Sequence, residues 1–182
     1  MDRYDITATF FVVGSWVDKY PESVKALSDA GHEVMNHSNS HAHMSQLSTQ
    51  EIVADLNACN DKIEAVTGVR PTLVRLPYGD YDDNAVRAVR SIGMEPIQWD
   101  VDSLDWKEIP AEEIVQRVTG KVQPGSIVLF HNAALHTPEA LPSILETLIQ
   151  EGYTFVPISQ LILDGEYNTD YTIDHTGRQC PA

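Results

Sequence analysis

The sequence predicts an α/β fold with parallel strands, in the form of a distorted (β/α) barrel. Apolar runs of strand length alternate with amphipathic segments of helix length along most of the 182 residues. Strict alternation predicts parallel strands joined by right-handed crossovers, which a doubly wound sheet and a barrel both satisfy. Titratable residues follow four of the strands at their carboxyl ends, which is where barrel enzymes build their active sites. This placement favours the barrel.

Six strands are recognisable. The first is rich in β-branched and aromatic residues and stops at Gly14, as a buried strand would. The expected strands cover residues 6–13, 32–36, 72–76, 96–99, 126–130 and 153–158.

Helix signals fill the stretches between these strands. Pro21 opens one helix at a first-turn position and Gly31 closes it. Ser48 followed by Glu51 is a capping-box pattern that starts a second, longer helix. The remaining helices are expected over 83–92, from Pro110 onward, over 137–152 and over 158–163.

Length and composition indicate one domain. A chain of this length can bury its own core, and 42% hydrophobic residues is ordinary for a globular protein. We expect a barrel domain over residues 1–163 and an irregular tail over 164–182, because the tail is polar and aperiodic.

The net charge of −15 argues against nucleic acid and anionic membrane partners, both of which need basic patches. It suits a neutral substrate. No apolar run approaches the ~18 residues of a membrane span, and the polar start shows no signal-peptide pattern. Two cysteines do not indicate a disulfide framework, so the cellular compartment stays open.

His37 and His41 stand four residues apart in the polar stretch His-Ser-Asn-Ser-His. Imidazole is a common zinc ligand, and a catalytic zinc keeps three protein ligands and a water. The two side chains form a candidate half of such a site. The alternative is a chance cluster on a surface loop. We favour the metal site because other titratable residues share the placement at strand ends.

A hydrolase built around this metal needs further groups. His131, at the end of a strand, is a candidate general acid, and Asp105 or Asp102 could orient it. A backbone N–H near Tyr78 could hold an oxyanion. Plain structural roles remain open for each: the aspartates could cap loops, His131 could be a core histidine, and Arg75 could form a surface ion pair.

Four stretches resemble, in the family's order, the motifs of the polysaccharide deacetylases (carbohydrate esterase family 4, the chitooligosaccharide deacetylase-like domain). They are His37-Ser-Asn-Ser-His41 for the HSxxH metal motif, Arg75-Leu-Pro77-Tyr78 for RxPY, Asp102-Ser103-Leu-Asp105-Trp106 for DSxDW, and Leu129-Phe-His131 for the last LxH motif. The resemblance covers nearly the whole chain to about residue 163.

The resemblance implies a metal-dependent hydrolase and a role for each motif residue. His37 and His41 would bind a divalent metal, most often zinc, with cobalt or nickel as other options. His131 would be the general acid, assisted by Asp105. Arg75 would orient the base carboxylate, and the Tyr78 amide would form the oxyanion hole. The pocket for the acetyl group would be lined by Trp106 and Leu129, with Asp102 nearby.

One family motif is absent from the sequence. The family's TFDDG motif supplies the catalytic base and the third metal ligand, and the resemblance places it one helix before the strand at 6–13, upstream of Met1. The expectation is a shortened barrel that lacks its first strand, with little activity, because groups that act as a unit fail together. A shortened sheet would also expose an edge and favour self-association. His43 or another carboxylate could complete the metal site instead.

The implied substrate is an acetylated polysaccharide, either an N-acetylglucosamine polymer such as peptidoglycan or chitin, or acetylated xylan. Two other functions stay open: a glycan-binding module without turnover, and a metal hydrolase acting on small amides. By family analogy the location would be the cell surface or the exterior.

Overall fold

The computed structural model describes residues 1–162, 171–174 and 179–181. They form two compact units, and each is described by itself. The β1–β4 unit consists of Thr7–Gln98 and Pro157–Ile162. The β5–β6 unit consists of Met1–Ile6, Trp99–Val156 and the described residues beyond 170.

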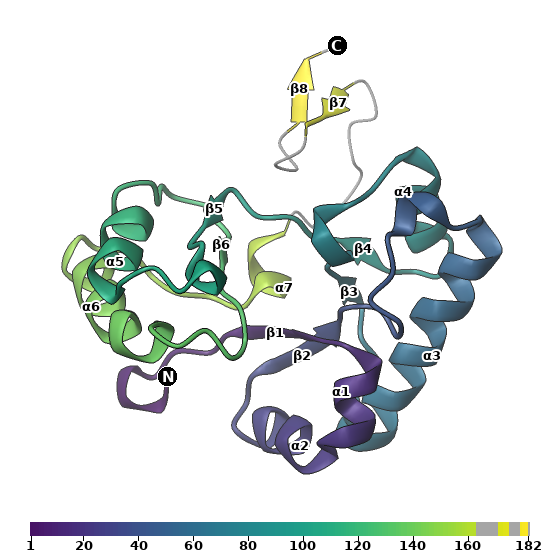
Figure 1. Cartoon of the computed structure of the whole chain (residues 1–182), viewed down its shortest axis with the longest axis horizontal. Coiled ribbons are helices and arrows are strands. Elements are labelled where there is room, and N and C mark those ends of the chain that lie inside the picture. Colours follow the sequence, from purple (N-terminus) through teal and green to yellow (C-terminus); the bar gives the residue numbers. More distant parts are fainter. Residues whose placement is uncertain (163–170, 175–178, 182) are drawn as a thin grey trace. The chain divides into compact units, whose positions relative to one another are not determined.

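The β1–β4 unit is built on one parallel sheet (Figure 1). Its strands are β1 (Thr9–Val12), β2 (Glu33–Asn36), β3 (Leu73–Val74) and β4 (Glu95–Pro96). They are hydrogen-bonded neighbours in chain order. A doubly wound sheet reverses its strand order at a switch point. Because this sheet advances in one direction only, it supports the barrel over the doubly wound alternative.

Helices follow the strands of this unit: α1 (Gly14–Lys19), α2 (Pro21–Asp29), α3 (Thr49–Thr67), α4 (Asp83–Ser91) and the short α7 (Ile158–Leu161). The expected capping box starts α3, where the Ser48 hydroxyl accepts from the Glu51 N–H and the Glu51 carboxylate accepts from the Ser48 N–H. The helix ends at Gly68, whose φ of 76° suits glycine.

The long helix α3 packs apolar side chains into two hydrophobic clusters. Ile52 and Leu56 are fully buried in a cluster with residues of α4. Cys59 and Ile63 are fully buried in a cluster with residues of β1, β2, α1 and α2. The helix therefore forms a rigid support behind the carboxyl ends of β1 and β2.

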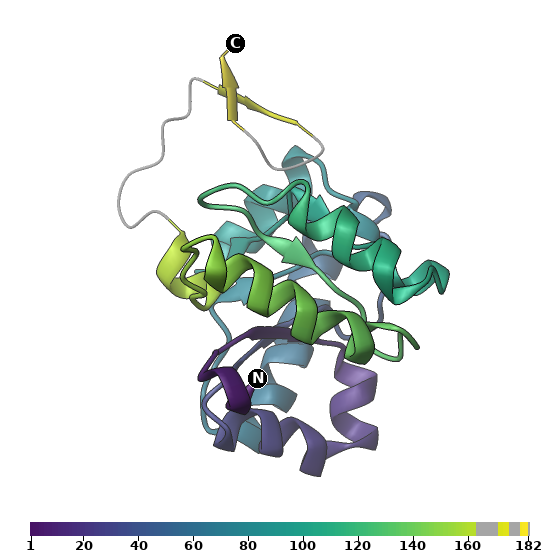
Figure 2. The same ribbon diagram turned by 90° about the vertical axis from the view of Figure 1, so that its left-hand side faces the viewer.

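The β5–β6 unit contains the parallel strands β5 (Val101–Asp102) and β6 (Val128–Leu129) and the helices α5 (Ala111–Thr119) and α6 (Thr137–Gln150). The two helices lie side by side (Figure 2). Ile114, Ala140 and Ile144 are among the buried residues between them. One-turn 3-10 helices lie at Asp2–Tyr4 and Asp105–Lys107 in this unit, and at Met44–Gln46 and Pro77–Gly79 in the other.

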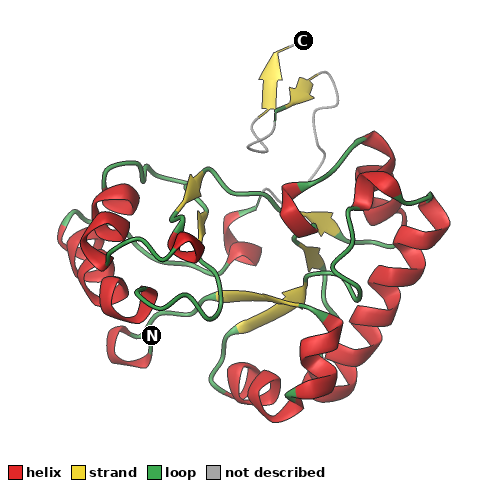
Figure 3. Ribbon diagram, in the orientation of Figure 1, coloured by secondary structure: helices red, strands yellow, loops and turns green. Residues whose placement is uncertain are grey.

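The structure corrects several expected elements (Figure 3). Of the expected strand over 96–99, only Pro96 lies in a strand, β4, and the separate strand β5 begins at Val101 in the other unit. Residues 153–157 form no strand, and the N–H of Ile158 is bonded to the Thr9 hydroxyl instead. Helix α1 is an addition to the predicted elements: Gly14, which the pattern marks as the end of a strand, is also the first residue of this helix. The other strands are shorter than predicted.

In the region expected to be an irregular tail, β7 (Tyr171–Ile173) pairs antiparallel with β8 (Gln179–Pro181). The remainder of that prediction, including Leu163 at the end of the expected last helix, lies outside the described residues. The division into a domain over 1–163 and a tail stays a prediction.

Candidate functional site

The loop that follows β2 carries the two histidines. The His37 N–H donates to the Val12 carbonyl (3.0 Å), so the strand pairing continues into the loop. Ser38 and His41 both have positive φ, 72° and 57°. A non-glycine residue adopts this conformation only where its surroundings hold it there. The Ser38 hydroxyl contributes to that hold by accepting the His41 N–H (2.7 Å).

Polar side chains of β2 and α3 hold this loop in place. The Asn36 side chain is fully buried, and its oxygen accepts the Ser38 N–H (2.6 Å) while its nitrogen donates to Asn60 (2.7 Å) on α3. The two carboxylate oxygens of Asp55, also on α3, accept the N–H groups of Asn39 (2.8 Å) and Ser40 (3.0 Å). The loop is therefore bonded directly to the helix that supports the sheet.

The His37 and His41 rings meet edge to face, with centroids 5.0 Å apart. His37 Nδ1 lies 2.6 Å from the Arg75 carbonyl oxygen, and His41 Nδ1 lies 3.1 Å from the Tyr78 hydroxyl. A partner on Nδ1 fixes the tautomer and leaves Nε2 as the ligand nitrogen, which is the usual arrangement at metal sites. The pair fits two ligands of a metal ion. Within the described part of the chain, no group of three His, Cys, Asp or Glu side chains is placed to hold one.

Arg75 follows β3 and is buried, with 8% of its surface exposed, so it is not the surface ion pair left open above. Its guanidinium lies over the Phe11 ring, 4.5 Å from the centroid, and Nη2 donates to the Gln98 carbonyl (3.3 Å). Burial lowers the pKa of Arg75 to about 10, so the side chain is a buried cation at neutral pH.

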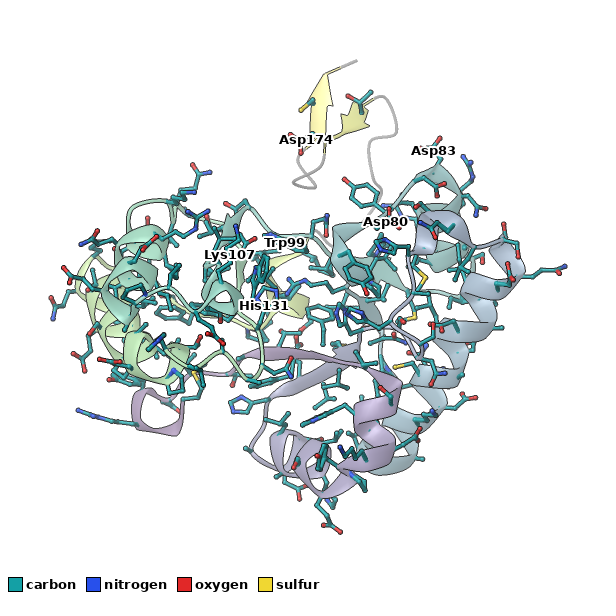
Figure 4. All side chains as sticks on the ribbon, viewed as in Figure 1. Asp80, Asp83, Trp99, Lys107, His131 and Asp174 are labelled. Carbon is teal, nitrogen blue, oxygen red and sulfur yellow. The ribbon has the colours of Figure 1, made fainter. Side chains whose placement is uncertain are left out.

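Tyr78 has a φ of 62° although it is not glycine, and its side chain is exposed. Its ring stacks on His43 with centroids 4.1 Å apart and an interplanar angle of 13°. His43 Nδ1 lies 3.4 Å from Asp80 Oδ2, and Asp80 also accepts bonds from the Ser45 hydroxyl and N–H. Asp80 is labelled in Figure 4.

The β5–β6 unit holds the second group of candidate residues, around His131 at the end of β6 (Figure 4). His131 Nδ1 lies 2.8 Å from Asp105 Oδ1, and the backbone N–H of His131 donates to Asp105 Oδ2 (3.0 Å). The Thr137 hydroxyl donates to the same carboxylate (2.7 Å). The His131 side chain is 36% exposed, so it is not a core histidine.

Asp105 is fully buried and ionised. Burial raises the pKa of its carboxyl group, but hydrogen bonds from His131, Thr137 and Ser103 outweigh this and hold the pKa at about 2. The carboxylate therefore fixes His131 with Nδ1–H toward Asp105 and leaves Nε2 available.

Other predicted pocket residues surround this pair. Trp106 is exposed, and its ring meets the His131 ring edge-on with 6.4 Å between the ring centroids. The Lys107 ammonium lies over the Trp106 ring. Leu129 is buried in β6. The Asp102 carboxylate accepts the Leu104 N–H (2.9 Å), which is the loop-capping role left open above.

The structure thus brings His37, His41, Arg75 and Tyr78 together in one unit, and the other five predicted residues together in the second. The sequence interpretation missed Asn36, Asp55 and Asn60, which hold the histidine loop. Asn36 at the end of an apolar strand was the one available signal, because a polar residue there needs a buried partner.

No helix among the described residues is both long enough and apolar enough to cross a bilayer.

Comparison with known proteins identifies the family. The sequence profile described as Polysaccharide deacetylase matches residues 1–97. The peptidoglycan-N-acetylmuramic acid deacetylase PdaC of Bacillus subtilis is 38% identical over 161 residues, which are 88% of this chain and 34% of PdaC. The peptidoglycan-N-acetylglucosamine deacetylase PgdA of Listeria monocytogenes is 35% identical over 88% of this chain and 34% of its own length.

A solved structure shares the fold. The wild-type protein BA3943 of Bacillus anthracis, described as a pseudoenzyme of carbohydrate esterase family 4 (CE4), superimposes with a TM-score of 0.85 at 37% identity, over 88% of this chain and 57% of that one. This likeness confirms the barrel type of the fold. The chain spans about a third of the length of PdaC and PgdA. With a profile match over more than half of its residues, the chain belongs to the polysaccharide deacetylase family.

Proposed function

We propose that this chain is a metal-dependent deacetylase domain that hydrolyses the N-acetyl groups of peptidoglycan amino sugars. Membership of the family and the names of PdaC and PgdA support the substrate class. The observation that carries the proposal is the histidine pair, in which each Nδ1 faces a polar partner, the arrangement that presents Nε2 to a metal ion at metal sites. The net charge of −15 agrees with a neutral sugar substrate.

The metal would be zinc, with cobalt or nickel as alternatives, held by Nε2 of His37 and of His41. When bound, it would polarise the acetyl carbonyl and lower the pKa of a water molecule. Two imidazoles give a neutral donor set that suits such an ion. A third ligand would come from a carboxylate, and His43 is engaged by Tyr78 and Asp80 instead.

The protein's own residues would perform the remaining steps. His131, with Nδ1–H held by Asp105, would donate a proton from Nε2 to the departing amine. The backbone N–H of Tyr78 would stabilise the oxyanion. Arg75, a buried cation, would orient a carboxylate base. Trp106 and Leu129 would enclose the acetyl methyl group, and Asp102 would shape the same loop.

The base itself is not among these residues. The two aspartates that the family resemblance assigns as base and third ligand do not occur as a TFDDG motif in the sequence. The adjacent pair Asp82 and Asp83 does not replace them, because Asp82 caps α4 by accepting the Ala85 N–H (2.8 Å). A missing general base typically costs about 10²- to 10⁴-fold in rate, so we expect slow turnover by these 182 residues.

The test is acetate release from N-acetylglucosamine oligomers and peptidoglycan fragments, with zinc and with chelator. We expect slow, zinc-dependent release that His41→Ala and His131→Ala abolish. Calorimetry should show that His41→Ala loses zinc binding and His131→Ala keeps it. His136→Ala is the matched control, since the His136 imidazole forms a long ion pair with Glu139, 3.9 Å between Nδ1 and Oε2, and the variant should retain both acetate release and zinc binding.

A glycan-binding module without turnover is the second candidate, favoured by the likeness to the BA3943 pseudoenzyme. A mutant of that protein is described as having restored enzymatic activity, so the same fold supports both states. Zinc and sugar binding without any acetate release would favour this candidate over the first. By analogy with the named relatives we place either function at the cell wall, on the outer side of the cell.

A further inference from the structure

The side chain of Tyr78 has contacts that the proposed role of its backbone N–H does not require. The residue has a strained φ of 62° and follows Pro77 in a one-turn 3-10 helix. Its ring contacts two imidazoles, those of His41 and His43. Because the Tyr78 side chain is exposed, hydrophobic burial contributes little to holding its ring. The ring's main contacts are therefore those with the two histidines.

The contact with His41 is directional. The Tyr78 hydroxyl lies 3.1 Å from His41 Nδ1, and the rings meet at 71° with centroids 4.7 Å apart. A phenol oxygen can accept the Nδ1–H of a neutral imidazole. When it does so, the proton is held on Nδ1 and the lone pair remains on Nε2, the nitrogen that a metal would use.

The second ring contact of Tyr78 is with His43. The two rings are nearly parallel, 13° apart, with centroids at 4.1 Å. His43 is itself oriented by Asp80, whose carboxylate is fixed by the hydroxyl and the N–H of Ser45. The contacts thus form a continuous chain from Ser45 through Asp80, His43 and Tyr78 to His41.

We propose that the Tyr78 hydroxyl is a positioning group for His41, and that His43, oriented by Asp80, keeps the tyrosine ring in place. The hydroxyl accepts Nδ1–H of His41 and so prepares Nε2 as a metal ligand. This inference rests on the proposed metal site but concerns a side chain to which neither the fold nor the family motif gives a task.

The test is Tyr78→Phe, which keeps the ring and removes only the hydroxyl. In the metal-free chain, ¹⁵N NMR of the His41 ring should show mainly the Nδ1–H tautomer in the wild type and a shift toward the Nε2–H tautomer in the variant. The zinc dissociation constant measured by calorimetry should rise about tenfold, the lower end of the range for such outer partners. An unchanged tautomer would overturn the proposal, as would an unchanged affinity in a chain that binds zinc.

The NMR measurement needs no metal, so the two proposals can fail separately. A wild-type chain that binds no zinc would contradict the proposed function, while the tautomer would still decide the role of Tyr78. Tyr153→Phe is the matched control. It removes a hydroxyl bonded to the Val122 carbonyl at 3.2 Å in the other unit and should change neither readout.

A double-mutant cycle tests the part assigned to His43. We expect His43→Ala to weaken zinc binding several-fold in the wild-type background and to have no further effect in Tyr78→Phe, because its influence passes through the hydroxyl. His43→Phe keeps a stacking ring and should restore most of the affinity. Equal effects of His43→Ala in both backgrounds would overturn this part of the proposal.

Discussion

The Asp105 carboxylate is bonded to His131 twice, once through the imidazole Nδ1 at 2.8 Å and once through the backbone N–H at 3.0 Å. A side chain that binds both the ring and the backbone of one residue fixes both its rotamer and its position. Asp105 is fully buried, so the pair contributes to stability as well as to the proposed chemistry.

This pair makes stability depend on acid pH. The pKa of Asp105 is lowered from 3.8 to about 2 in the folded chain, so the folded state favours the carboxylate. The contribution is complete above the unfolded pKa near 4 and is lost as the pH falls through 2. A shift of this size corresponds to roughly 2 kcal/mol. We expect the unfolding free energy of the wild type to fall by about this much more than that of Asp105→Asn between pH 5 and pH 2.

Urea unfolding at a series of pH values measures this difference. Asp83→Asn is the matched control, because the Asp83 side chain is 92% exposed and forms just a long ion pair with Arg87, 3.6 Å from Oδ2 to Nη1. Asp83 is labelled in Figure 4. The control should follow the wild-type profile. Parallel profiles for wild type and Asp105→Asn would mean that the pair is not ionised as described.

The second prediction concerns Asp55, whose two oxygens accept the N–H groups of Asn39 and Ser40. Asp55→Ala leaves both donors without this partner and removes two of the hydrogen bonds between the loop and α3. Hydrogen bonds to charged groups contribute about 1.5–3 kcal/mol each. Because the bond to Asn39 is partly buried and the bond to Ser40 is exposed, we expect a loss of about 2 kcal/mol in stability. Zinc affinity should fall about tenfold, because the loop carries both histidines.

Asp61→Ala provides the comparison on the same helix. Asp61 is 70% exposed and pairs with Arg70 at 2.8 Å, and such surface pairs contribute about 0–1 kcal/mol. Its removal should leave zinc binding unchanged. Equal losses of zinc affinity in the two variants would show that Asp55 does not anchor the loop.

The sequence predicted the elements whose signals are local. The capping box of α3 appears where the pattern placed it, and the apolar residues Ile52, Leu56, Cys59 and Ile63 of that helix are buried. The His131–Asp105 contact also follows from motif order, because β5 and β6 are parallel neighbours whose carboxyl ends lie at the same edge. Whether these residues perform the proposed chemistry stays a prediction.

Other features of the structure depend on hydrogen bonds between residues that are far apart in the sequence, and a local sequence pattern does not predict such bonds. The expected strand over 96–99 is reduced to Pro96, and the next strand, β5, begins after Asp100, whose carboxylate accepts the Ser126 hydroxyl and the Ile127 N–H, both at 2.7 Å. The Asp55 and Asn60 contacts link positions 15 to 24 residues apart. Nothing in the local pattern marks a helical aspartate or asparagine as the partner of a distant loop.

The third prediction concerns the close approach of α1 to the histidine loop. A Cβ on Gly14 would collide with Asn39, reaching its Oδ1 and lying 3.0 Å from its Cα. The Gly14 N–H also donates to the Ser38 carbonyl (3.0 Å). Glycine is unfavourable in helices by about 1 kcal/mol relative to alanine. Gly14→Ala would therefore stabilise the helix if there were room for a Cβ at this position.

Here we expect Gly14→Ala to destabilise the chain by about 1–3 kcal/mol, the usual cost of overpacking, and to weaken zinc binding by moving the loop. Ser15→Ala, at the neighbouring exposed position of α1, should be neutral or slightly stabilising. Thermal unfolding and calorimetry of both variants provide the comparison. A Gly14→Ala chain more stable than wild type would show that the loop has room to move away.

The last prediction uses Asn36, whose buried amide donates to the Leu56 carbonyl (2.9 Å) and to Asn60 Oδ1 (2.7 Å). Asn36→Asp keeps the shape but replaces the donor with an oxygen that faces two acceptors. A carboxylate there is buried and repelled, so its pKa rises above the ordinary value and the neutral form is favoured in the folded state. The cost therefore grows as the pH rises above about 4, and at pH 8 an unpaired buried charge costs about 3–5 kcal/mol.

Urea unfolding midpoints at pH 4 and pH 8 measure this cost. The control is Asn57→Asp, the same change on α3 at a side chain whose Oδ1 lies 3.1 Å from Nη2 of the exposed Arg70. We expect this control to change the unfolding free energy by less than about 0.5 kcal/mol. A pH-independent effect of Asn36→Asp would mean that water or a cation reaches the Asn36 site, and that the histidine loop is not closed off from solvent on that side.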